Sequence, residues 1–453
     1  MTHRIAIVAG TRPEIIKLAP IIRALTRYTD AESLFILSGQ HYDFEMVHAF
    51  LRDLNLPPPI ENLEVGSGSQ AQQTAQILVG CENLIRKYKP DFVVAEGDTN
   101  TVAATSLAAV KLHVPFGHVE AGLRSYDRRM PEEINRMIAR VCAELHFAPT
   151  PRAAINLLYE GVPPNKVFIT GNTIVDACLD HLEIAKERSK ILEDLHLDRG
   201  KPIITVTMHR PGNVDDEKHL SIIVESLIEL KEFQIVFPVH PRTLKMLEAS
   251  GLERLKTVSH IILTKPLGYL DFLKLLSASS LVMTDSGGVQ EEALTLRIPC
   301  LTLRHSTERP ETVESGYNRL VELRKESIVR HTRELIGYNT LRGNSTDAPN
   351  PLGDGHAGGR IAAILVDACR KGVALDSPDY YEAGSATFKV IKASADIAGK
   401  TIGDLTEKNP RVLITLVHNQ EGRPLFPFSD LTVEDGWLIR IFGQEPDLKS
   451  YRG

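Results

Sequence analysis

Three short polar segments of this sequence place carboxylates where proton chemistry needs them. They are Glu96-Gly97-Asp98-Thr99, Gly117-His118-Val119-Glu120 and Pro131-Glu132-Glu133. Carboxylates move protons and stabilise developing positive charge. Structural roles compete, because Asp98 can cap a helix that begins near Thr99 and glutamates after a proline suit a first helical turn. The segments therefore predict a set of acid/base candidates, although one of the last two glutamates is expected to be structural.

A glycine-rich turn in the second half of the chain has the composition of a phosphate-binding loop. The apolar run Ser280-Leu-Val-Met283 leads into Ser286-Gly287-Gly288 and then a helix. Glycines let the backbone approach an anion, and a helix N-terminus presents N–H groups and partial positive charge. Glu291 and Glu292 are placed to accept hydrogen bonds from nucleotide hydroxyls. A lone pair of glycines is more often an ordinary turn, so this interpretation depends on the rest of the chain.

The start of the chain repeats the strand, loop and helix arrangement. Strand residues 4–9 precede Gly10-Thr11-Arg12-Pro13, and the proline suits the first helical position. Arg12 and Lys17 bring positive charge to that loop. His209 follows another apolar run, where a packed histidine and a functional one fit the sequence equally well. Together with the glycine turn, these residues indicate an anionic, phosphorylated ligand.

Apolar runs alternate with helical patterns through most of the chain. Runs such as 91–95 and 234–237 are typical of parallel strands covered by helices on both faces. A break near residues 171–200 separates two sheets. We therefore expect two facing Rossmann-like, doubly wound α/β domains at residues 1–172 and 173–376, with ligand loops at a shared cleft. The β-rich residues 378–453 predict a small α+β C-terminal domain.

Bulk properties exclude several classes of protein. The 453 residues carry a formal net charge of −6 and no basic stripe with interleaved aromatics, which argues against nucleic-acid binding. No run of about 20 apolar residues is present to span a bilayer, and the chain opens with a strand and not a signal peptide, so we expect a cytoplasmic protein that does not bind membranes. The five cysteines are scattered and form no metal or redox motif.

Taken in order, these motifs resemble the non-hydrolysing and hydrolysing UDP-N-acetylglucosamine 2-epimerases. The resemblance spans about residues 1–372 and includes further blocks at 39–41, 208–210, 305–311 and 350–355. It implies a fold similar to the two-domain glycosyltransferases of the B type. It also implies inversion at C2 of UDP-GlcNAc to UDP-ManNAc for polysaccharide synthesis, with UDP leaving to give a 2-acetamidoglucal and then adding back. No metal or nicotinamide cofactor is implied.

The resemblance also implies roles for individual residues. Four positions match the catalytic groups: Asp98, Glu120, Glu132 and His209. His209 would help UDP depart, whereas the choice of carboxylate that removes the C2 proton stays open. The positions expected to bind UDP or the sugar are Arg12, Lys17, Gln40, His41, Arg136, Arg210, Ser286, Gly287, Gly288, Glu292 and Arg309. Among them, Arg12 and the glycine turn would contact phosphate and Glu292 the ribose.

Two departures from the family pattern affect the expected substrate. Gly212 stands where family members commonly carry a glutamate, and the segment 316–321 ends in Val321 without the customary glycine. A modified sugar, such as a diacetamido uronic acid, is therefore an alternative to UDP-GlcNAc. A hydrolysing epimerase that releases ManNAc and UDP, a UDP-sugar glycosyltransferase and a nucleotide-sugar sensor are alternative functions. The set of three carboxylates favours elimination and readdition.

The tail from about residue 385 resembles the C-terminal ligand-binding domain of TrkA-type potassium-transport regulators. The matching elements include Ile397-Ala-Gly-Lys-Thr-Ile402 and Leu431-Thr-Val-Glu-Asp-Gly436. The resemblance implies a module that binds a small-molecule effector, and a dimerisation appendage without a ligand fits equally well. We therefore expect a homodimer and an effector site in this tail.

Overall fold

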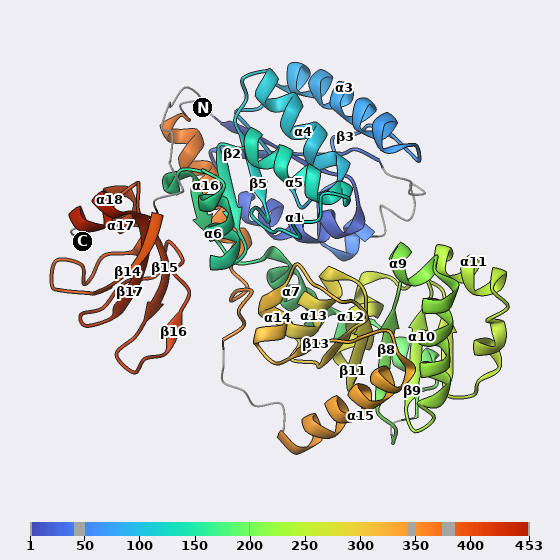
Figure 1. Cartoon of the computed structure of the whole chain (residues 1–453). Helices are drawn as coiled ribbons and strands as arrows, with labels where there is room; N and C mark the ends of the chain where they lie inside the picture. The colour runs from blue at the N-terminus through green and yellow to red at the C-terminus, as the bar shows by residue number, and fades with distance from the viewer. Residues whose placement is uncertain (1, 40–49, 199, 343–348, 374–385, 452–453) are drawn as a thin grey trace. The chain divides into compact units, whose positions relative to one another are not determined.

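The computed structural model describes residues 2–39, 50–198, 200–342, 349–373 and 386–451 (Figure 1). Contacts divide the chain into two compact units. The first contains residues 1–176 and 353–453, and the second contains residues 177–352. Within the described residues no helix is long and apolar enough to cross a membrane.

The first unit contains a seven-stranded parallel sheet in the order β3-β2-β1-β4-β5-β6-β7. Its strands are β1 (His3–Ala9), β2 (Ala31–Leu37), β3 (Glu61–Asn62), β4 (Phe92–Glu96), β5 (Phe116–Val119), β6 (Leu145–Ala148) and β7 (Val167–Ile169). The main helices are α1 (Arg12–Leu25), α3 (Gln70–Tyr88), α4 (Asn100–Lys111), α5 (Pro131–Cys142) and α6 (Pro151–Tyr159). The buried apolar strands confirm the predicted doubly wound fold.

The second unit repeats this architecture with a six-stranded parallel sheet in the order β10-β9-β8-β11-β12-β13. Its strands are β8 (Ile203–Thr207), β9 (Gln234–Pro238), β10 (Ile261–Thr264), β11 (Leu281–Thr284), β12 (Cys300–Thr302) and β13 (Asn318–Leu320). Its helices include α9 (Pro211–Val214), α10 (Glu217–Glu229), α11 (Pro241–Ala249), α12 (Tyr269–Ser277), α13 (Gly287–Thr295), α14 (Pro310–Glu314) and α15 (Lys325–Arg342). The helix α7 (Thr173–Arg188) leads from the first unit into the second.

Each sheet has one topological switch point, where the strand order reverses and ligands bind in open α/β folds. In the first unit it lies between β1 and β4, and in the second between β8 and β11. The loops after these four strands carry Arg12, Asp98, His209 and Ser286. The predicted site residues therefore cluster at the two positions where this topology opens a crevice.

The chain returns to the first unit through α16 (Ala357–Lys371), which packs on α1. A Cβ at Gly358 would lie 2.6 Å from Pro20 Cβ, so only glycine allows this close approach. The backbone N–H groups of Ala357 and Gly358 donate to the Asp176 carboxylate at 3.2 and 2.7 Å. The helix that the sequence assigns to the second domain thus makes its contacts within the first unit.

The C-terminal domain contains an antiparallel sheet in the order β14-β17-β15-β16. Its elements are β14 (Ala386–Lys392), α17 (Ile402–Lys408), β15 (Leu413–His418), β16 (Pro424–Leu425), β17 (Leu438–Gln444) and α18 (Glu445–Ser450). Trp437 and Ile439 belong to its own core, whereas Phe428 and Phe442 join a cluster with Leu157 of α6. This small domain is therefore built onto the first unit through a shared apolar core.

Candidate active site

Glu14 ties together the two loops at the switch point of the first unit. Its carboxylate accepts hydrogen bonds from the N–H groups of Gly10 and Thr11, each at 2.6 Å, and from the hydroxyl of Thr99. Thr99, and not Asp98, is the N-cap of α4. Burial raises the pKa of Glu14, although these donors oppose the effect. The capping role considered for Asp98 thus belongs to its neighbour.

Lys17 contacts two buried carboxyl groups, one at the end of β4 and the other just after β5. Its Nζ lies 3.1 Å from Glu96 Oε1 and forms a hydrogen bond with Glu120 Oε2. Glu120 follows β5 with φ of 63°, in the left-handed region that costs a non-glycine residue about 1 kcal/mol or more. Burial raises the pKa of Glu96 well above its ordinary value against the opposing charge of Lys17. Glu120 is thus held in a conformation that the surrounding fold must impose, and Glu96 is held in an environment that disfavours its charge.

Asp98 is positioned by a buried chain of charged groups. Arg136 of α5 donates to Asp98 through Nη2 and to Glu133 through Nη1 at 2.7 Å. Glu133 also accepts from Ser125 N and Oγ at 2.9 and 3.0 Å. Burial raises the pKa of Glu133, but the bonds from Ser125 and Arg136 outweigh it and lower the pKa overall. The side chain of Asp98 keeps 28% exposure, which suits a group that meets a ligand.

The two glutamates after Pro131 occupy different environments. Glu133 is 2% exposed and supports Arg136, whereas Glu132 is exposed in the first turn of α5. One of the pair is therefore structural, as the sequence suggests, and Glu133 fills that role. The catalytic assignment of Glu132 stays a prediction.

His118 is a buried, neutral support for the Asp98 loop. Its Nε2 lies 2.8 Å from the carbonyl oxygen of Gly97, so the ring donates to that oxygen. Burial lowers the pKa of His118 to about 4. This contact agrees with an orienting role for His118.

The other predicted residues of the first unit lie outside this cluster or outside the described residues. The Arg12 guanidinium stacks 5.6 Å from the ring centre of Phe50. Gln40 and His41 fall within residues 40–49, which the structure does not describe. Their assignments stay predictions.

Asp285 organises the switch point of the second unit. It is fully buried at the end of β11 and accepts from the backbone N–H groups of His209 and Arg210 at 3.1 and 3.0 Å and from Asn213 Nδ2 at 3.1 Å. The His209 Nδ1 lies 3.4 Å from Asp285 Oδ1, and its side chain is 48% exposed. Burial lowers the pKa of His209, and the Asp285 charge opposes that effect. Asp285 therefore fixes the position of the loop that carries His209, the residue predicted to help UDP leave.

The glycine turn forms the N-terminus of α13, as predicted. Ser286 is the N-cap, and its side chain makes no capping hydrogen bond within the helix. A Cβ at Gly287 would lie 3.0 Å from the Arg309 guanidinium, whereas a Cβ at Gly288 would meet nothing within 4 Å. Gly287 thus admits Arg309 to the helix end, while Gly288 leaves open space where an anion can approach.

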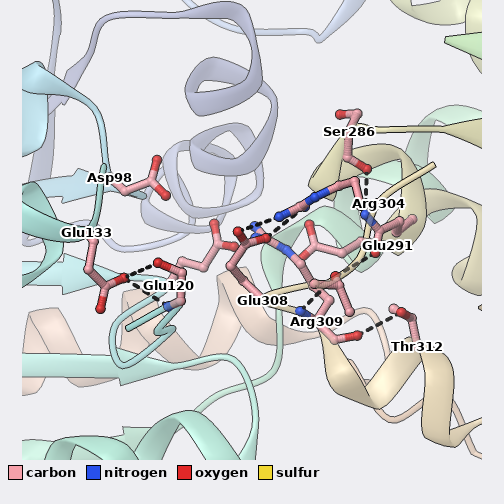
Figure 2. A network of polar contacts seen from close by, with 12 residues as sticks. Asp98, Glu120, Glu133, Ser286, Glu291, Arg304, Glu308, Arg309 and Thr312 are labelled. Carbon is pink, nitrogen blue, oxygen red and sulfur yellow. Dashed lines mark hydrogen bonds and ion pairs between the residues drawn. The ribbon is translucent and has the colours of Figure 1, made fainter. Parts of the chain in front are cut away.

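Arg304 and Arg309 form linked ion pairs with Glu308 and Glu291 beside this helix end (Figure 2). Arg309 Nε donates to Glu291 Oε1 at 2.9 Å, and Arg304 donates to both oxygens of Glu308 at 3.0 and 2.8 Å. Arg210 Nη2 lies 3.9 Å from Glu308 Oε2. Burial would raise the pKa of Glu308, but Arg304 and its neighbouring arginines bring it to about 2. The cluster is rich in cations and suits a diphosphate.

Several of these groups carry no role in the sequence interpretation. They are Asp285, Arg304 and Glu308, whereas Glu96 entered only as a member of a polar segment. A charged residue that closes an apolar run at a strand end was the available signal for Glu96 and Asp285. Glu292 is buried in α13, and its predicted contact with ribose is untested. Among the described residues, no group of three or more His, Cys, Asp or Glu side chains is arranged to hold a metal.

Comparison with known proteins identifies the family. The family model for UDP-N-acetylglucosamine 2-epimerase matches residues 23–366. The UDP-N-acetylglucosamine 2-epimerase of Methanocaldococcus jannaschii is 45% identical over 369 residues, which cover 80% of this chain and 98% of that enzyme. This chain belongs to the UDP-N-acetylglucosamine 2-epimerase family. An epimerase is an isomerase, so the predicted family and enzyme class are confirmed.

Two further comparisons bear on fold and substrate. The crystal structure of the M. jannaschii epimerase in complex with UDP-GlcNAc and UDP superposes with a TM-score of 0.73 at 44% identity, covering 80% of this chain and 99% of that one. The UDP-2,3-diacetamido-2,3-dideoxy-D-glucuronate 2-epimerase of Pseudomonas aeruginosa is 37% identical over 366 residues, or 80% of this chain and 99% of that enzyme. The epimerase fold is thus confirmed, and the family model ends before the C-terminal domain begins.

Proposed function

We propose that this 2-epimerase inverts C2 of UDP-GlcNAc to give UDP-ManNAc without net hydrolysis. One observation supports the proposal most strongly. This chain has a buried carboxyl cluster at the switch point of its first unit and an arginine-rich helix N-terminus at the switch point of its second. The first suits proton transfer and the second suits a diphosphate. The 45% identity to an enzyme named for this reaction supports the choice of sugar.

Elimination explains why both kinds of cluster are needed. The C2 proton lies beside an acetamido nitrogen and not a carbonyl, so it is poorly acidic in the intact sugar. When the C1–O bond to UDP breaks, positive charge develops on the ring and the C2 proton becomes removable. The electrons of the C2–H bond then form the C1=C2 double bond of a 2-acetamidoglucal, and UDP keeps the electrons of the broken C1–O bond. Return of a proton to the other face of C2, with readdition of UDP, completes the inversion.

The residues divide this work according to their surroundings. Arg309, Arg304 and the helix end that begins at Gly287 would stabilise the departing UDP, with the loop of His209 contributing a proton or hydrogen bond. Asp98 and Glu120 would stabilise the cationic ring and carry protons. The assignments of Arg12, Arg136 and Arg210 to the substrate belong to this proposal too. Arg136 would act through Asp98, which it holds.

Proton NMR in deuterated water tests the proposal directly. The full-length protein is incubated with UDP-GlcNAc, and C2 is followed in the sugar nucleotide pool. Deuterium at C2 with the UDP linkage intact is expected. Free ManNAc with UDP would instead indicate a hydrolysing epimerase. Absence of exchange, with sugar transfer only when an acceptor is added, would indicate a glycosyltransferase and overturn the proposal.

A relative from P. aeruginosa supports an alternative substrate, a diacetamido uronic acid nucleotide. That enzyme is named for a diacetamido glucuronate and is 37% identical to this chain. The same NMR assay with the diacetamido uronic acid nucleotide separates the two substrates. We expect a higher kcat/KM for UDP-GlcNAc, and a higher value for the uronic acid would reassign the sugar while leaving the chemistry in place.

We further propose that the C-terminal domain regulates the epimerase through Arg360 of α16. The Arg360 side chain donates to Asp354 at 2.7 and 2.8 Å and to Asp430 at 3.1 Å, and it stacks 3.7 Å from the centre of the Phe428 ring. Asp354 lies beside the point where the chain re-enters the first unit. Asp430 and Phe428 belong to the C-terminal domain. This contact gives the domain a physical path to a segment that joins the two units.

A cavity of about 490 Å³ supports the proposed effector site. It lies between α16, β7 and the C-terminal domain, and its volume falls in the range of small-molecule pockets. The lining includes Ile169, Ile364, Asp367, Ile402 and Glu407. Lys371 bridges Asp367 and Glu407, each at 3.0 Å. An effector that bound here would regulate the enzyme only by favouring one conformation over another.

The regulatory proposal is tested with Asp430→Asn in the full-length protein. We expect faster amide hydrogen exchange in residues 353–360 and a changed half-saturating concentration of UDP-GlcNAc. Asp435→Asn, at an exposed position of the same domain, is the matched control and should behave as wild type. Unchanged exchange and unchanged kinetics in Asp430→Asn would show that the domain is an uncoupled appendage.

Homodimerisation and the TrkA-type resemblance of this domain also remain proposals. Sedimentation equilibrium of the full-length protein is expected to give twice the mass of one chain. A single-chain mass across micromolar concentrations would contradict the dimer. The cytoplasmic location is likewise an expectation from the sequence, which fractionation of the producing cells can check.

A further inference from the structure

Glu96 and Glu120 form an unusual pair of buried carboxyl groups. They are 2% and 6% exposed, and both contact the ammonium of Lys17. One ammonium balances the charge of only one carboxylate, so burial favours a proton on the other. The arrangement therefore favours a proton held beside the predicted catalytic Glu120.

The surroundings of Glu96 offer little to stabilise a second negative charge. Its Oε1 is buried and makes no hydrogen bond within the described residues, although it lies near Lys17. The charged groups that act on it are Glu14 and Lys17 from α1 and Glu120 just after β5. Glu14 already accepts hydrogen bonds from Gly10 and Thr11 of the first loop and from Thr99 of the second. Burial and these like charges raise the pKa of Glu96 well above its ordinary value.

We propose that Glu96 is a positioning residue that shares a proton with Glu120 and so keeps Glu120 ready both to take and to give a proton at C2. This inference rests on the proposed epimerase function. Epimerisation removes a proton from one face of C2 and returns one to the other, so the acid/base groups must be restored after each turnover. When Glu120 takes up a proton, the proton shared with Glu96 stays on Glu96. When Glu120 gives one up, Glu96 returns its proton to Glu120.

Glu96→Gln tests the inference because glutamine keeps the size and hydrogen bonding of the side chain but cannot exchange a proton. We expect kcat for C2 exchange to fall by about 10- to 100-fold with the KM for UDP-GlcNAc changed less than about threefold. In the wild type the shared proton is held to higher pH, because its loss leaves two negative charges side by side. Glu96→Gln leaves only one acid, so the limb of the pH–rate profile at which this proton is lost should move to lower pH by about one unit or more.

Glu96→Asp provides the conservative rescue. Aspartate retains an exchangeable proton, so the profile should lie closer to that of the wild type and activity should exceed that of Glu96→Gln. A thermal unfolding midpoint near the wild-type value shows that each variant is folded. If Glu96→Gln is destabilised, the comparison with Glu96→Asp still separates loss of the carboxyl group from loss of packing.

The outcomes distinguish this inference from the proposed function itself. Wild-type protein that fails to exchange C2 would overturn the function. Wild-type exchange together with an unshifted pH profile and normal kcat in folded Glu96→Gln would overturn only the role of Glu96. A fall in activity of equal size in both Glu96 variants, without any pH shift, would also contradict proton sharing.

Discussion

Both switch points bury glutamates, but the pKa values of Glu14 and Glu96 in the first unit are raised and that of Glu308 in the second is lowered. In the first unit, Glu14 and Glu96 have raised pKa values because burial dominates. In the second, burial acts on Glu308 too, but Arg304 and its neighbouring arginines bring the pKa to about 2. Cations and hydrogen-bond donors oppose the effect of burial, and they outweigh it at Glu308 but not at Glu14 or Glu96. One region is therefore suited to holding protons and the other to holding an anion.

Loss of a carboxylate in the first region should have the largest effect. Asp98→Asn and Glu120→Gln are each expected to lower C2 exchange by about 10³-fold or more, because neither amide can accept the proton. UDP affinity should stay within about twofold of wild type by calorimetry. Glu82→Gln, which removes an acid that is 45% exposed, is the control and should leave both quantities unchanged. Normal exchange in both Asp98→Asn and Glu120→Gln would refute the proton-handling role of this region.

Variants of Glu132 and Glu133, the neighbouring glutamates of α5, distinguish a catalytic role from a structural one in that region. Glu132→Gln is expected to lower exchange by about 10²-fold without a change in thermal midpoint, because the residue is exposed. Glu133→Gln should lower both, since it weakens a buried ion pair with Arg136, a loss worth about 3 kcal/mol. Exchange assays and thermal unfolding of the two proteins measure the difference. Wild-type activity in Glu132→Gln would move the catalytic assignment away from Glu132.

A methyl group at the glycine turn probes the second region. Gly288→Ala should weaken UDP binding by about tenfold, because the new Cβ fills space that the diphosphate needs. The fold should be unaffected, since that Cβ meets no atom within 4 Å. Gly359→Ala is matched to it, as its Cβ also meets nothing within 4 Å, and it should bind UDP normally. Equal UDP affinity in both variants would place the diphosphate elsewhere.

The smallest effect at neutral pH is expected from His118→Gln, which keeps a donor for Gly97. Burial lowers the pKa of His118 from 6.5 to about 4, so between these values the unfolded chain binds the extra proton. This contribution to stability is complete above pH 6.5 and is lost as the pH falls to 4. It amounts to about 3 kcal/mol. The thermal midpoint of wild type should therefore fall faster than that of the variant below pH 6.5, and parallel curves would contradict a neutral buried ring.

The sequence predicts the framework of this molecule well because its signals are local. Continuous apolar runs such as Phe92–Ala95 can only be covered strands, and the polar residues that follow them must lie at the carboxyl edge of a sheet. The motifs, taken in their order along the chain, indicate the 2-epimerase family. The expectations for Asp98 and Glu120 rest on the resemblance of their motifs to those of the epimerase family.

What the sequence does not reveal depends on contacts between distant segments. Helix-start signals treat Glu132 and Glu133 alike, and only the fold decides which one meets Arg136 and Ser125. In the sequence, Glu96 is only the last residue of a predicted strand. The fold brings Lys17 into contact with both Glu96 and Glu120. Similarly, α16 follows the second sheet in sequence but packs on α1, because Gly358 allows contact with Pro20.

The dependence of C2 exchange on UDP-GlcNAc concentration, compared between Glu120→Gln and Gly288→Ala, tests the division of labour most directly. We predict that Gly288→Ala reaches the wild-type maximal rate, but only at higher substrate concentration. Glu120→Gln should stay inactive at every concentration. Recovery of Glu120→Gln by added substrate, or a lowered maximal rate with unchanged half-saturation in Gly288→Ala, would contradict the assignment of proton transfer to one region and diphosphate binding to the other.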